Sequence, residues 1–476
     1  MADSYDLAVI GAGSGGIVAA RFAARAGARV ALIEKHRIGG DCTWTGCVPS
    51  KALLKVARVA HETRDSSLFG LSVTDIEPVN LKKVMDYVRR SISMVYRYET
   101  PEILREEGVD VLMGQAKFED ARTLAVASTN SETTITAKNI VLCAGARPII
   151  PGVQGLQDVP YVTHEQVFDL DVLPKHLLII GGGPVGVEMA QAFRRLGSQV
   201  SMFQGPARLL PRDEPEAAEV LARVLRDEGI RLHLSRRVTE VVRSDGDIVV
   251  RSNAGEAKGD TLLVATGRRP NVDTLNLQRA GVTFTAKGVP VDDFLRTNVK
   301  HIYAAGDVLG GPQFTHYAGY QAFIAARNAL FPGASKGVVQ SVPWTTFTDP
   351  EVAHVGLTEA EARNKDHGMD VDVRIMEMER VDRAVTESDT SGFIKIVHKK
   401  DGPVVGATVV AERAGEVINE WALAISNNLK MSDLASTIHV YPTYSIANQQ
   451  LASAYSIESF LGGTAGKALR KLRGLN

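Results

Sequence analysis

Two glycine loops of the same design constrain what this chain can fold into. Residues 6–10 form a short apolar run that leads into the loop G-A-G-S-G-G at 11–16, and an Ala-rich helical segment follows. A second apolar run at 177–180 leads in the same way into G-G-G-P-V-G at 181–186. Glycines spaced like this, between a strand and a helix, let the backbone approach a pyrophosphate. The sequence therefore predicts two Rossmann-like dinucleotide-binding domains in one chain.

The residue that ends the second strand differs between the two repeats. The first repeat has Glu34 there, where a carboxylate binds the ribose of an adenosine. The second repeat has Gln204 at the same offset, and Arg208 and Arg212 follow closely. An amide lacks the repulsion that a carboxylate exerts on a 2'-phosphate, and arginine attracts that phosphate. We expect the second site to bind NAD(P)H, with NADPH favoured over NADH.

A cysteine pair lies just after the first repeat. Residues 39–51 are G-G-D-C-T-W-T-G-C-V-P-S-K, so that Cys42 and Cys47 belong to one short segment. The spacing suits about one turn of helix, which would place both sulfurs on one face. A zinc site needs about four ligands, and no such partners occur nearby. We therefore expect a redox-active disulfide beside a flavin and no metal site.

The composition indicates an ordinary soluble, multidomain protein. The chain has 476 residues, 45% of them hydrophobic and 23% charged, with a net charge of -1, and nothing here favours nucleic acid as a partner. Three cysteines are too few for a secreted disulfide framework, and we expect Cys143 to be a buried hydrophobe. The N-terminus lacks a signal-peptide pattern, and no apolar stretch approaches the roughly 20 residues that span a bilayer. These features predict a cytoplasmic location.

The C-terminal tail is basic and amphipathic. Lys467, Arg470, Lys471 and Arg473 alternate with small and apolar residues. Such a segment can contact an anionic membrane, but a solvated terminal helix is the simpler interpretation.

The remaining pattern divides the chain further. The segments 139–148 and 260–270 resemble each other as strand-and-turn exits from the two nucleotide domains, and they contain Gly145 and Gly267. Beyond about residue 340, strands such as 393–397 and 404–410 and a helix at 414–427 form an α+β pattern without a glycine loop. We predict an α/β fold with an FAD-binding domain at 1–150, an NAD(P)-binding domain at 151–275, a central domain at 276–342 and a C-terminal α+β dimerisation domain at 343–476.

Together, these motifs resemble the pyridine nucleotide-disulfide oxidoreductases, which include dihydrolipoamide dehydrogenase, glutathione reductase and mercuric reductase. The resemblance rests on the cysteine segment, both glycine loops, A-T-G-R-R-P at 265–270 and Y-A-A-G-D at 303–307, and its details are closest to mercuric reductase-like proteins. It implies a homodimer whose active site is shared between subunits.

The resemblance also implies roles for individual residues. Cys42 matches the interchange thiol that acts on the acceptor, and Cys47 matches the thiol that faces the flavin. Lys51 and Glu188 match an ion pair beside the flavin N5, and Asp307 matches a carboxylate that binds the ribityl chain. The residues expected to contact FAD or NAD(P)H are Gly11, Gly13, Gly16, Glu34, Gly40, Gly145, Asp307, Gly181, Gly183, Gly186, Gln204, Arg208 and Gly267.

The chain departs from the family at the acid/base position. Glutathione reductase and dihydrolipoamide dehydrogenase use a histidine in a His-Pro-Thr segment, oriented by a glutamate, but here Tyr441 and Ile446 take those two places. A tyrosine of pKa about 10 is a poor general base at neutral pH. His439 would share a strand face with Tyr441 if the segment were extended and would then be placed to replace the base, although a packing or surface histidine is the simpler interpretation.

The expected function is transfer of electrons from NAD(P)H through FAD to the Cys42–Cys47 disulfide, and then to a disulfide or thiol-bound metal acceptor. Mercuric reductases also carry a C-terminal cysteine pair, whereas this sequence ends L-R-G-L-N. One alternative is a diaphorase that reduces quinones or oxygen directly from the flavin. Another, of a different class, is a non-catalytic redox sensor or electron-transfer subunit that docks through the basic tail.

Overall fold

A computed structural model describes residues 3–73, 77–129, 131–364, 368–400 and 402–475. The chain forms two compact units. The first combines Met1–Phe203 with Arg236–Val339, and the second combines Gln204–Ser235 with Gln340–Asn476.

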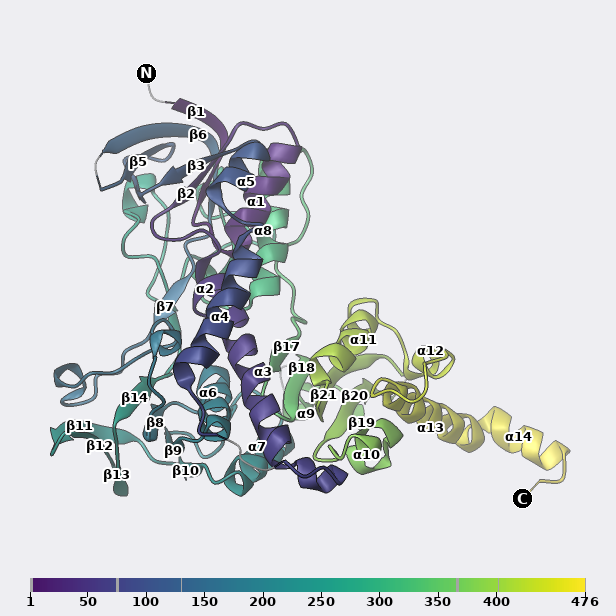
Figure 1. Cartoon of the computed structure of the whole chain (residues 1–476). Helices are drawn as coiled ribbons and strands as arrows, with labels where there is room; N and C mark the ends of the chain where they lie inside the picture. The colour runs from purple at the N-terminus through teal and green to yellow at the C-terminus, as the bar shows by residue number, and fades with distance from the viewer. Residues whose placement is uncertain (1–2, 74–76, 130, 365–367, 401, 476) are drawn as a thin grey trace. The chain divides into compact units, whose positions relative to one another are not determined.

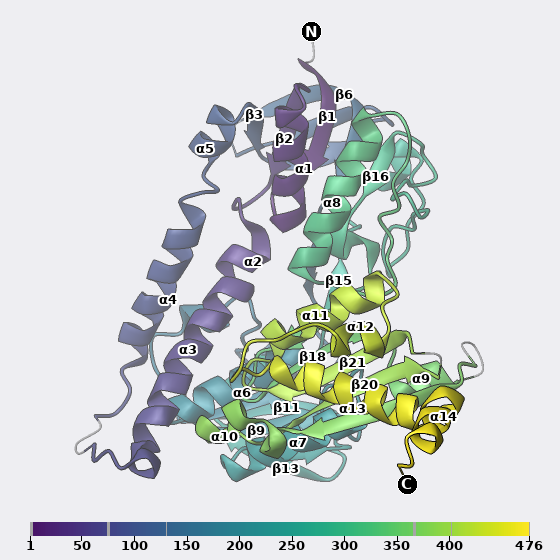
Figure 2. The same cartoon turned by 90° about the vertical axis from the view of Figure 1, so that its right-hand side faces the viewer.

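The first glycine loop follows β1, a central strand of a mainly parallel sheet in the first unit, which Figure 1 shows. Its parallel strands run in the order β3 (Val109–Met113), β2 (Val30–Glu34), β1 (Asp3–Ile10) and β6 (Glu132–Leu142), with β16 (Ile302–Ala304) also paired to β6. The antiparallel strands β5 (Thr123–Ala127) and β4 (Gln115–Phe118) extend the sheet. Helices α1 (Ser14–Arg25) and α8 (Thr315–Leu330) pack side by side (Figure 2). Strand β2 is buried along its whole length, as expected of a strand covered on both faces.

The cysteine segment lies on a chain of helices in the same unit. These are α2 (Gly40–Trp44), α3 (Cys47–Arg64), the 3-10 helix η1 (Ser66–Phe69), α4 (Leu81–Tyr96) and α5 (Pro101–Glu106). Helix α3 packs against α4 and also against α6 (Pro184–Leu196), which follows the second glycine loop. The two repeats therefore meet through α3 and α6.

The second repeat has the same strand–loop–helix–strand plan. Strands β9 (Gln199–Gln204), β8 (His176–Ile180) and β14 (Thr261–Val264) are parallel neighbours. Strands β11 (Val238–Ser244), β12 (Asp247–Ser252) and β13 (Gly255–Gly259) form an antiparallel meander, and β7 (Ala146–Pro148) pairs with β15 (Arg268–Pro270). The short 3-10 helices are η2 (Leu156–Asp158), η3 (Val167–Asp169), η4 (Leu277–Ala280) and η5 (Gly306–Leu309).

The second unit is built on an antiparallel sheet. Its strands run in the order β17 (Trp344–Thr346), β18 (Glu351–Gly356), β21 (Val404–Ala411), β20 (Phe393–Lys399) and β19 (Val371–Glu377). The other elements are α7 (Pro215–Asp227), β10 (Arg231–Leu234), α9 (Glu359–Arg363), η6 (Met378–Arg380), α10 (Asp382–Thr386), α11 (Ala414–Ser426), α12 (Met431–Ala435), α13 (Ile446–Gly462) and α14 (Thr464–Leu472). The predicted fold class is confirmed, whereas the boundaries at 150, 275 and 342 stay predictions.

A buried lysine explains why residues 204–235 belong to this second unit. Lys395 on β20 is 2% exposed, and its Nζ lies 3.2 Å from Glu214, 2.8 Å from Glu216 and 3.0 Å from Glu359. A buried charge needs such partners, so the lysine holds the start of α7 against the sheet. None of the helices within the described residues is long and apolar enough to cross a membrane.

Candidate redox site

The first glycine loop has the close contacts that a dinucleotide cradle requires. Gly11 has a φ of 100°, and a Cβ there would lie 2.3 Å from the carbonyl oxygen of Cys143, while a Cβ on Gly16 would lie 1.8 Å from that of Gly11. Gly13 precedes α1 without a side-chain cap, so the first N–H groups of the helix are not used by a capping side chain. The carboxylate of Glu34 accepts bonds from the backbone N–H of Ala12 and His36, both at 2.8 Å. This arrangement fits the diphosphate and ribose of FAD.

The second glycine loop repeats this geometry. Gly181 has a φ of 116°, and a Cβ there would lie 2.2 Å from the carbonyl oxygen of Ala265. A Cβ on Gly186 would lie 2.0 Å from the carbonyl oxygen of Gly181, and Gly183 precedes α6 without a side-chain cap. The residues therefore fit a second dinucleotide, which agrees with the expected NAD(P)H site. The exit turns contain Gly145 and Gly267 with φ values of 67° and 113°.

Gly40 explains how the cysteine segment meets the first loop. Its φ is 59°, and a Cβ at this position would lie 2.7 Å from the Cα of Gly13. Helix α2 therefore starts in direct backbone contact with the predicted FAD cradle.

Cys42 and Cys47 lie on different helices, so the expectation that one helical turn carries both is wrong. Cys42 is in α2, whereas Cys47 is the first residue of α3. Thr45 donates its backbone N–H to the carbonyl of Asp41 at 2.9 Å and closes α2, and Gly46 takes a non-helical conformation. A Cβ at Gly46 would lie 2.8 Å from that same carbonyl oxygen. The break places Cys47 at a helix N-terminus, where the backbone favours a thiolate.

Both cysteines are free thiols, and their environments differ. The thiol of Cys42 donates a hydrogen bond to Cys47, and this bond lowers the pKa of Cys47 to about 6. Thr315 and Lys51 also lower this pKa, whereas burial and the charge of Glu188 oppose the shift. The same bond, together with burial, raises the pKa of Cys42 well above its usual value. The pair therefore places its negative charge on Cys47. Neighbouring groups partly bury the thiol, but Cys47 as a residue is exposed in the chain by itself.

An ion pair stands one turn along α3 from Cys47. The Nζ of Lys51 lies 3.1 and 3.0 Å from the two carboxylate oxygens of Glu188 on α6. The carboxylate side chain is only 7% exposed, so it needs a cation nearby. The pair links the helix of the predicted flavin-facing thiol to the helix that begins at the second glycine loop.

A second ionic cluster lies beside Cys42, and sequence reasoning missed its central cation. The guanidinium of Arg268 donates to the carboxylate of Asp41, the residue before Cys42, and its Nη1 lies 3.1 Å from the carboxylate of Asp307. Burial raises the pKa of Asp307, and the charge of Arg268 opposes this. The motif at 265–270 contains Arg268, but nothing local in the sequence pairs it with residues 41 and 307.

Thr315 is another residue that the sequence did not single out. Its Oγ1 lies 3.2 Å from the sulfur of Cys47, and it is the first residue of α8.

Among the described residues, no group of three or more His, Cys, Asp or Glu side chains is placed to hold a metal ion.

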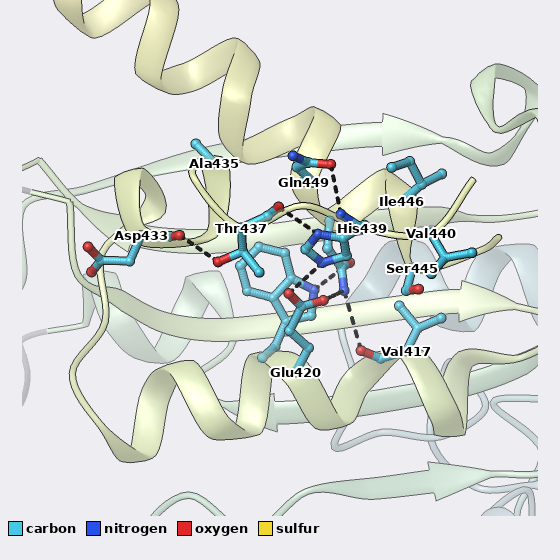
Figure 3. Close-up of polar contacts among 12 residues, drawn as sticks. Val417, Glu420, Asp433, Ala435, Thr437, His439, Val440, Ser445, Ile446 and Gln449 are labelled. Carbon is cyan, nitrogen blue, oxygen red and sulfur yellow. Dashed lines mark hydrogen bonds and ion pairs between the residues drawn. The ribbon is translucent and has the colours of Figure 1, made fainter. Parts of the chain in front are cut away.

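The segment that carries Tyr441 lies in the second unit and is not extended. Residues 437–445 contain no strand, so the condition under which His439 would share a strand face with Tyr441 is not met. Figure 3 shows the ring of His439 turned inward, with Nε2 at 2.6 Å from Glu420 and Nδ1 at 2.9 Å from the carbonyl of Thr437. Asn448 donates to the other oxygen of Glu420 at 2.7 Å. Both ring nitrogens are thus engaged within the unit.

Tyr441 has a different environment from His439. It is 63% exposed, and its phenol donates to the carboxylate of Asp382 at 2.6 Å. This hydrogen bond raises the pKa of Tyr441, which makes it still less suitable as a base. Ile446, at the position expected for a glutamate, is buried at the start of α13.

The residues expected to choose between NADH and NADPH also lie in the second unit. The side-chain amide of Gln204 donates to the carbonyl of Arg208 at 3.3 Å, and Arg208 donates to the carbonyl of Pro211 at 2.9 Å. These bonds organise the turn after β9.

Comparisons with known proteins agree with this architecture. Residues 5–322 match the family described as Pyridine nucleotide-disulphide oxidoreductase, and residues 342–452 match its dimerisation domain. A mercuric reductase of Lysinibacillus sphaericus is 36% identical over 448 residues, covering 93% of this chain and 81% of the relative. A mercuric reductase of Streptomyces lividans is 36% identical over 462 residues, covering 95% of this chain and 96% of the relative.

Solved structures give the same result. LpdA from Mycobacterium tuberculosis superposes with a TM-score of 0.87 at 28% identity, covering 95% of this chain and 99% of that one. The Cu(II) complex of the HOCl-induced flavoprotein disulfide reductase RclA from Escherichia coli superposes with a TM-score of 0.84 at 28% identity, covering 94% and 99%. The dimerisation domain indicates a homodimer. The chain therefore belongs to the pyridine nucleotide-disulfide oxidoreductases, a family of enzymes that use FAD and NAD(P)H.

Proposed function

We propose that this enzyme uses NAD(P)H to reduce the Cys42–Cys47 pair and that Cys42 passes the reducing equivalents to a disulfide or a thiol-bound soft metal ion. The observation that carries this proposal is the division of roles between the two thiols. Cys47 carries the negative charge at the start of α3, and Cys42 keeps its proton beside it. FAD, when bound, supplies the step that converts a hydride into electrons for a disulfide.

The chain's own residues arrange the remaining chemistry. Lys51 and Glu188 set the charge around Cys47, and Asp41 and Arg268 hold the start of α2, which carries Cys42. Cys42 attacks an acceptor disulfide, forms a mixed disulfide and releases the first half of the acceptor, which takes the proton that Cys42 gives up. The Cys47 thiolate then attacks the Cys42 sulfur, restores the Cys42–Cys47 bond and releases the second half of the acceptor as a thiolate. The relatives named mercuric reductase support a thiol-bound metal ion as one acceptor class. A reducing, cytoplasmic setting suits this cycle.

The nucleotide preference and the dimeric site are also proposals. The neutral Gln204 and the nearby Arg208 support NADPH over NADH. In the homodimer, we place Tyr441 of one subunit against the cysteine pair of the other. There its phenol, which keeps its proton in the bond to Asp382, lines the site and does not remove a proton, while His439 holds the segment in place.

A second candidate function follows from the missing base. Because the Tyr441 segment offers no free imidazole, direct reduction of quinones or oxygen from the flavin is the alternative reaction. The test is NADPH oxidation by the FAD-loaded enzyme with glutathione disulfide, lipoamide, thiol-bound Hg(II), a quinone or oxygen as acceptor. The proposal expects the favoured acceptor to be a disulfide or the metal ion, with activity lost in a Cys42→Ala, Cys47→Ala variant. The alternative would be established if that variant reduced a quinone at the full rate and if the enzyme showed no rate with the disulfides or the metal ion.

A further inference from the structure

The C-terminal helix α14 leaves an apolar stripe uncovered. Its apolar residues occupy positions 465, 468, 469 and 472, a spacing that places them on one face of the helix. Leu469 is 51% exposed and Leu472 is 82% exposed, and Leu475 just beyond the helix is 63% exposed. Single exposed leucines are common on protein surfaces, whereas a stripe of them on one helix indicates a surface that binds something.

Helix α14 is attached to α13 through a different face. Gly466 is buried, and a Cβ there would lie 2.0 Å from the carbonyl oxygen of Phe460. The backbone N–H of Gly463 donates to Ser459 at 3.0 Å, and the guanidinium of Arg470 donates to the carbonyl of Leu461 at 3.2 Å. In Figure 1, α14 continues from the end of α13 to the C-terminus. The attachment therefore uses Gly466, backbone atoms and the guanidinium of Arg470, and it leaves the leucines outside.

The exposed positions away from the leucines are basic. Lys467 and Lys471 lie opposite the leucine stripe, Arg473 directly follows the helix, and the sequence has no acidic residue after Glu458. The whole chain has a net charge of -1, so the positive charge here is a local concentration. A helix with leucines on one side and lysines and arginines on the other is typical of segments that lie in the interface of an anionic membrane.

A second copy of the chain fits this surface less well. The matched dimerisation domain ends at residue 452, before α14 begins. A symmetric contact through the leucine stripes would place two strongly basic helices side by side, and like charges repel. Anionic lipid phosphates instead complement Lys467, Lys471 and Arg473 at once.

We propose that α14 is an interfacial membrane anchor, with Leu469 and Leu472 entering the boundary between headgroups and acyl chains and with Lys467, Lys471 and Arg473 contacting lipid phosphates. Each lysine or arginine near an anionic surface raises the partition coefficient about fivefold. The anchor is weak by itself, but a homodimer presents two of them and gains from bivalence. The proposal does not depend on which acceptor the enzyme reduces.

The test is flotation of the full-length, FAD-loaded protein with vesicles. We expect binding to equal mixtures of phosphatidylglycerol and phosphatidylcholine, little binding to phosphatidylcholine alone, and loss of binding at about 0.5 M salt, where charges are screened. Leu469→Glu with Leu472→Glu removes binding, and Lys467→Gln with Lys471→Gln lowers the partition coefficient about 25-fold. Matched controls are Leu68→Glu, at a leucine that is 76% exposed, and Lys82→Gln with Lys83→Gln on α4. Both controls keep wild-type binding.

Several results would overturn the proposal. One is equal flotation with both vesicle types, and another is unchanged binding of the leucine variant to the anionic vesicles. A third is a Leu469→Glu, Leu472→Glu variant that changes from dimer to monomer in light scattering, which would assign the stripe to a second copy. Retained FAD absorbance and far-UV circular dichroism show that each variant is folded.

Discussion

The sulfur of Cys47 lies 3.2 Å from Oγ1 of Thr315, which joins the first residue of α3 to the first residue of α8. The two residues are far apart in the sequence, and the contact exists only because α8 packs beside α1 and its glycine loop. The hydroxyl stabilises the Cys47 thiolate, as does the Cys42 thiol. The charge of the reduced pair is therefore set by three elements that the fold brings together.

Thr315→Val should raise the pKa of Cys47, because valine keeps the shape of threonine but cannot donate a hydrogen bond to the thiolate. In the wild type the thiolate should disappear as the pH falls through about 6. The measurement is the pH dependence of the long-wavelength absorbance of the NADPH-reduced enzyme, which reports a thiolate beside the flavin. Thr315→Ser, which keeps the hydroxyl, is the matched control and should titrate like the wild type. Identical titrations of the valine variant and the wild type would contradict the assignment.

Replacing the two members of the Lys51–Glu188 pair should shift the pKa of Cys47 in opposite directions. The charge of Lys51 lowers this pKa and the charge of Glu188 raises it. Lys51→Met therefore moves the alkylation of Cys47 by iodoacetamide to higher pH, and Glu188→Gln moves it to lower pH. Shifts of the same sign would show that these variants act by disturbing the packing of α3 on α6 and not through charge.

Arg268→Gln should loosen FAD binding more than Asp41→Asn. Within the described part of the chain, Arg268 is the ion-pair partner of both Asp41 and Asp307, so its loss leaves two neighbouring carboxylates without their cation. The cost is about 2 kcal/mol, since the cluster is partly buried. Release of FAD on dilution, followed by flavin fluorescence, measures the effect. Combining the two substitutions should recover part of the loss, and a strictly additive double variant would argue against a shared cation.

The second unit should lose stability in mild acid through His354. Burial lowers the pKa of His354 to about 4, while the ring bonds to Thr408 at 2.7 Å. An unfolded histidine has a pKa of about 6.5, so between these values the unfolded chain binds a proton that the folded chain does not, and stability falls as the pH decreases. The full effect is about 3 kcal/mol. Urea unfolding at several pH values should show a shallower acid dependence for His354→Gln, and parallel curves would refute this account.

The sequence predicted the fold well because its evidence is local. Each glycine loop lies between a strand and a helix. Gly11 and Gly181 take positive φ values, which glycine adopts more readily than other residues. The C-terminal strand expected at 393–397 extends to Lys399, and the helix expected at 414–427 ends at Ser426. Such patterns need no knowledge of distant residues.

The site was less predictable because its chemistry depends on contacts between distant segments. The spacing of Cys42 and Cys47 suggested one helical turn, but Gly46 breaks the helix and gives Cys47 its own N-terminus. Arg268 and Thr315 reach the cysteine segment only through tertiary packing. The inward direction of His439 depends on Glu420, which lies on another helix.

The most direct test of the central claim is an anaerobic reductive titration of the FAD-loaded enzyme. The wild type should accept the electron equivalents of a flavin and a disulfide, with long-wavelength absorbance appearing before the flavin is fully reduced. Cys42→Ala with Cys47→Ala should accept only the equivalents of the flavin. A wild type that takes up no more electrons than this double variant would contradict the claim that Cys42 and Cys47 form the redox centre.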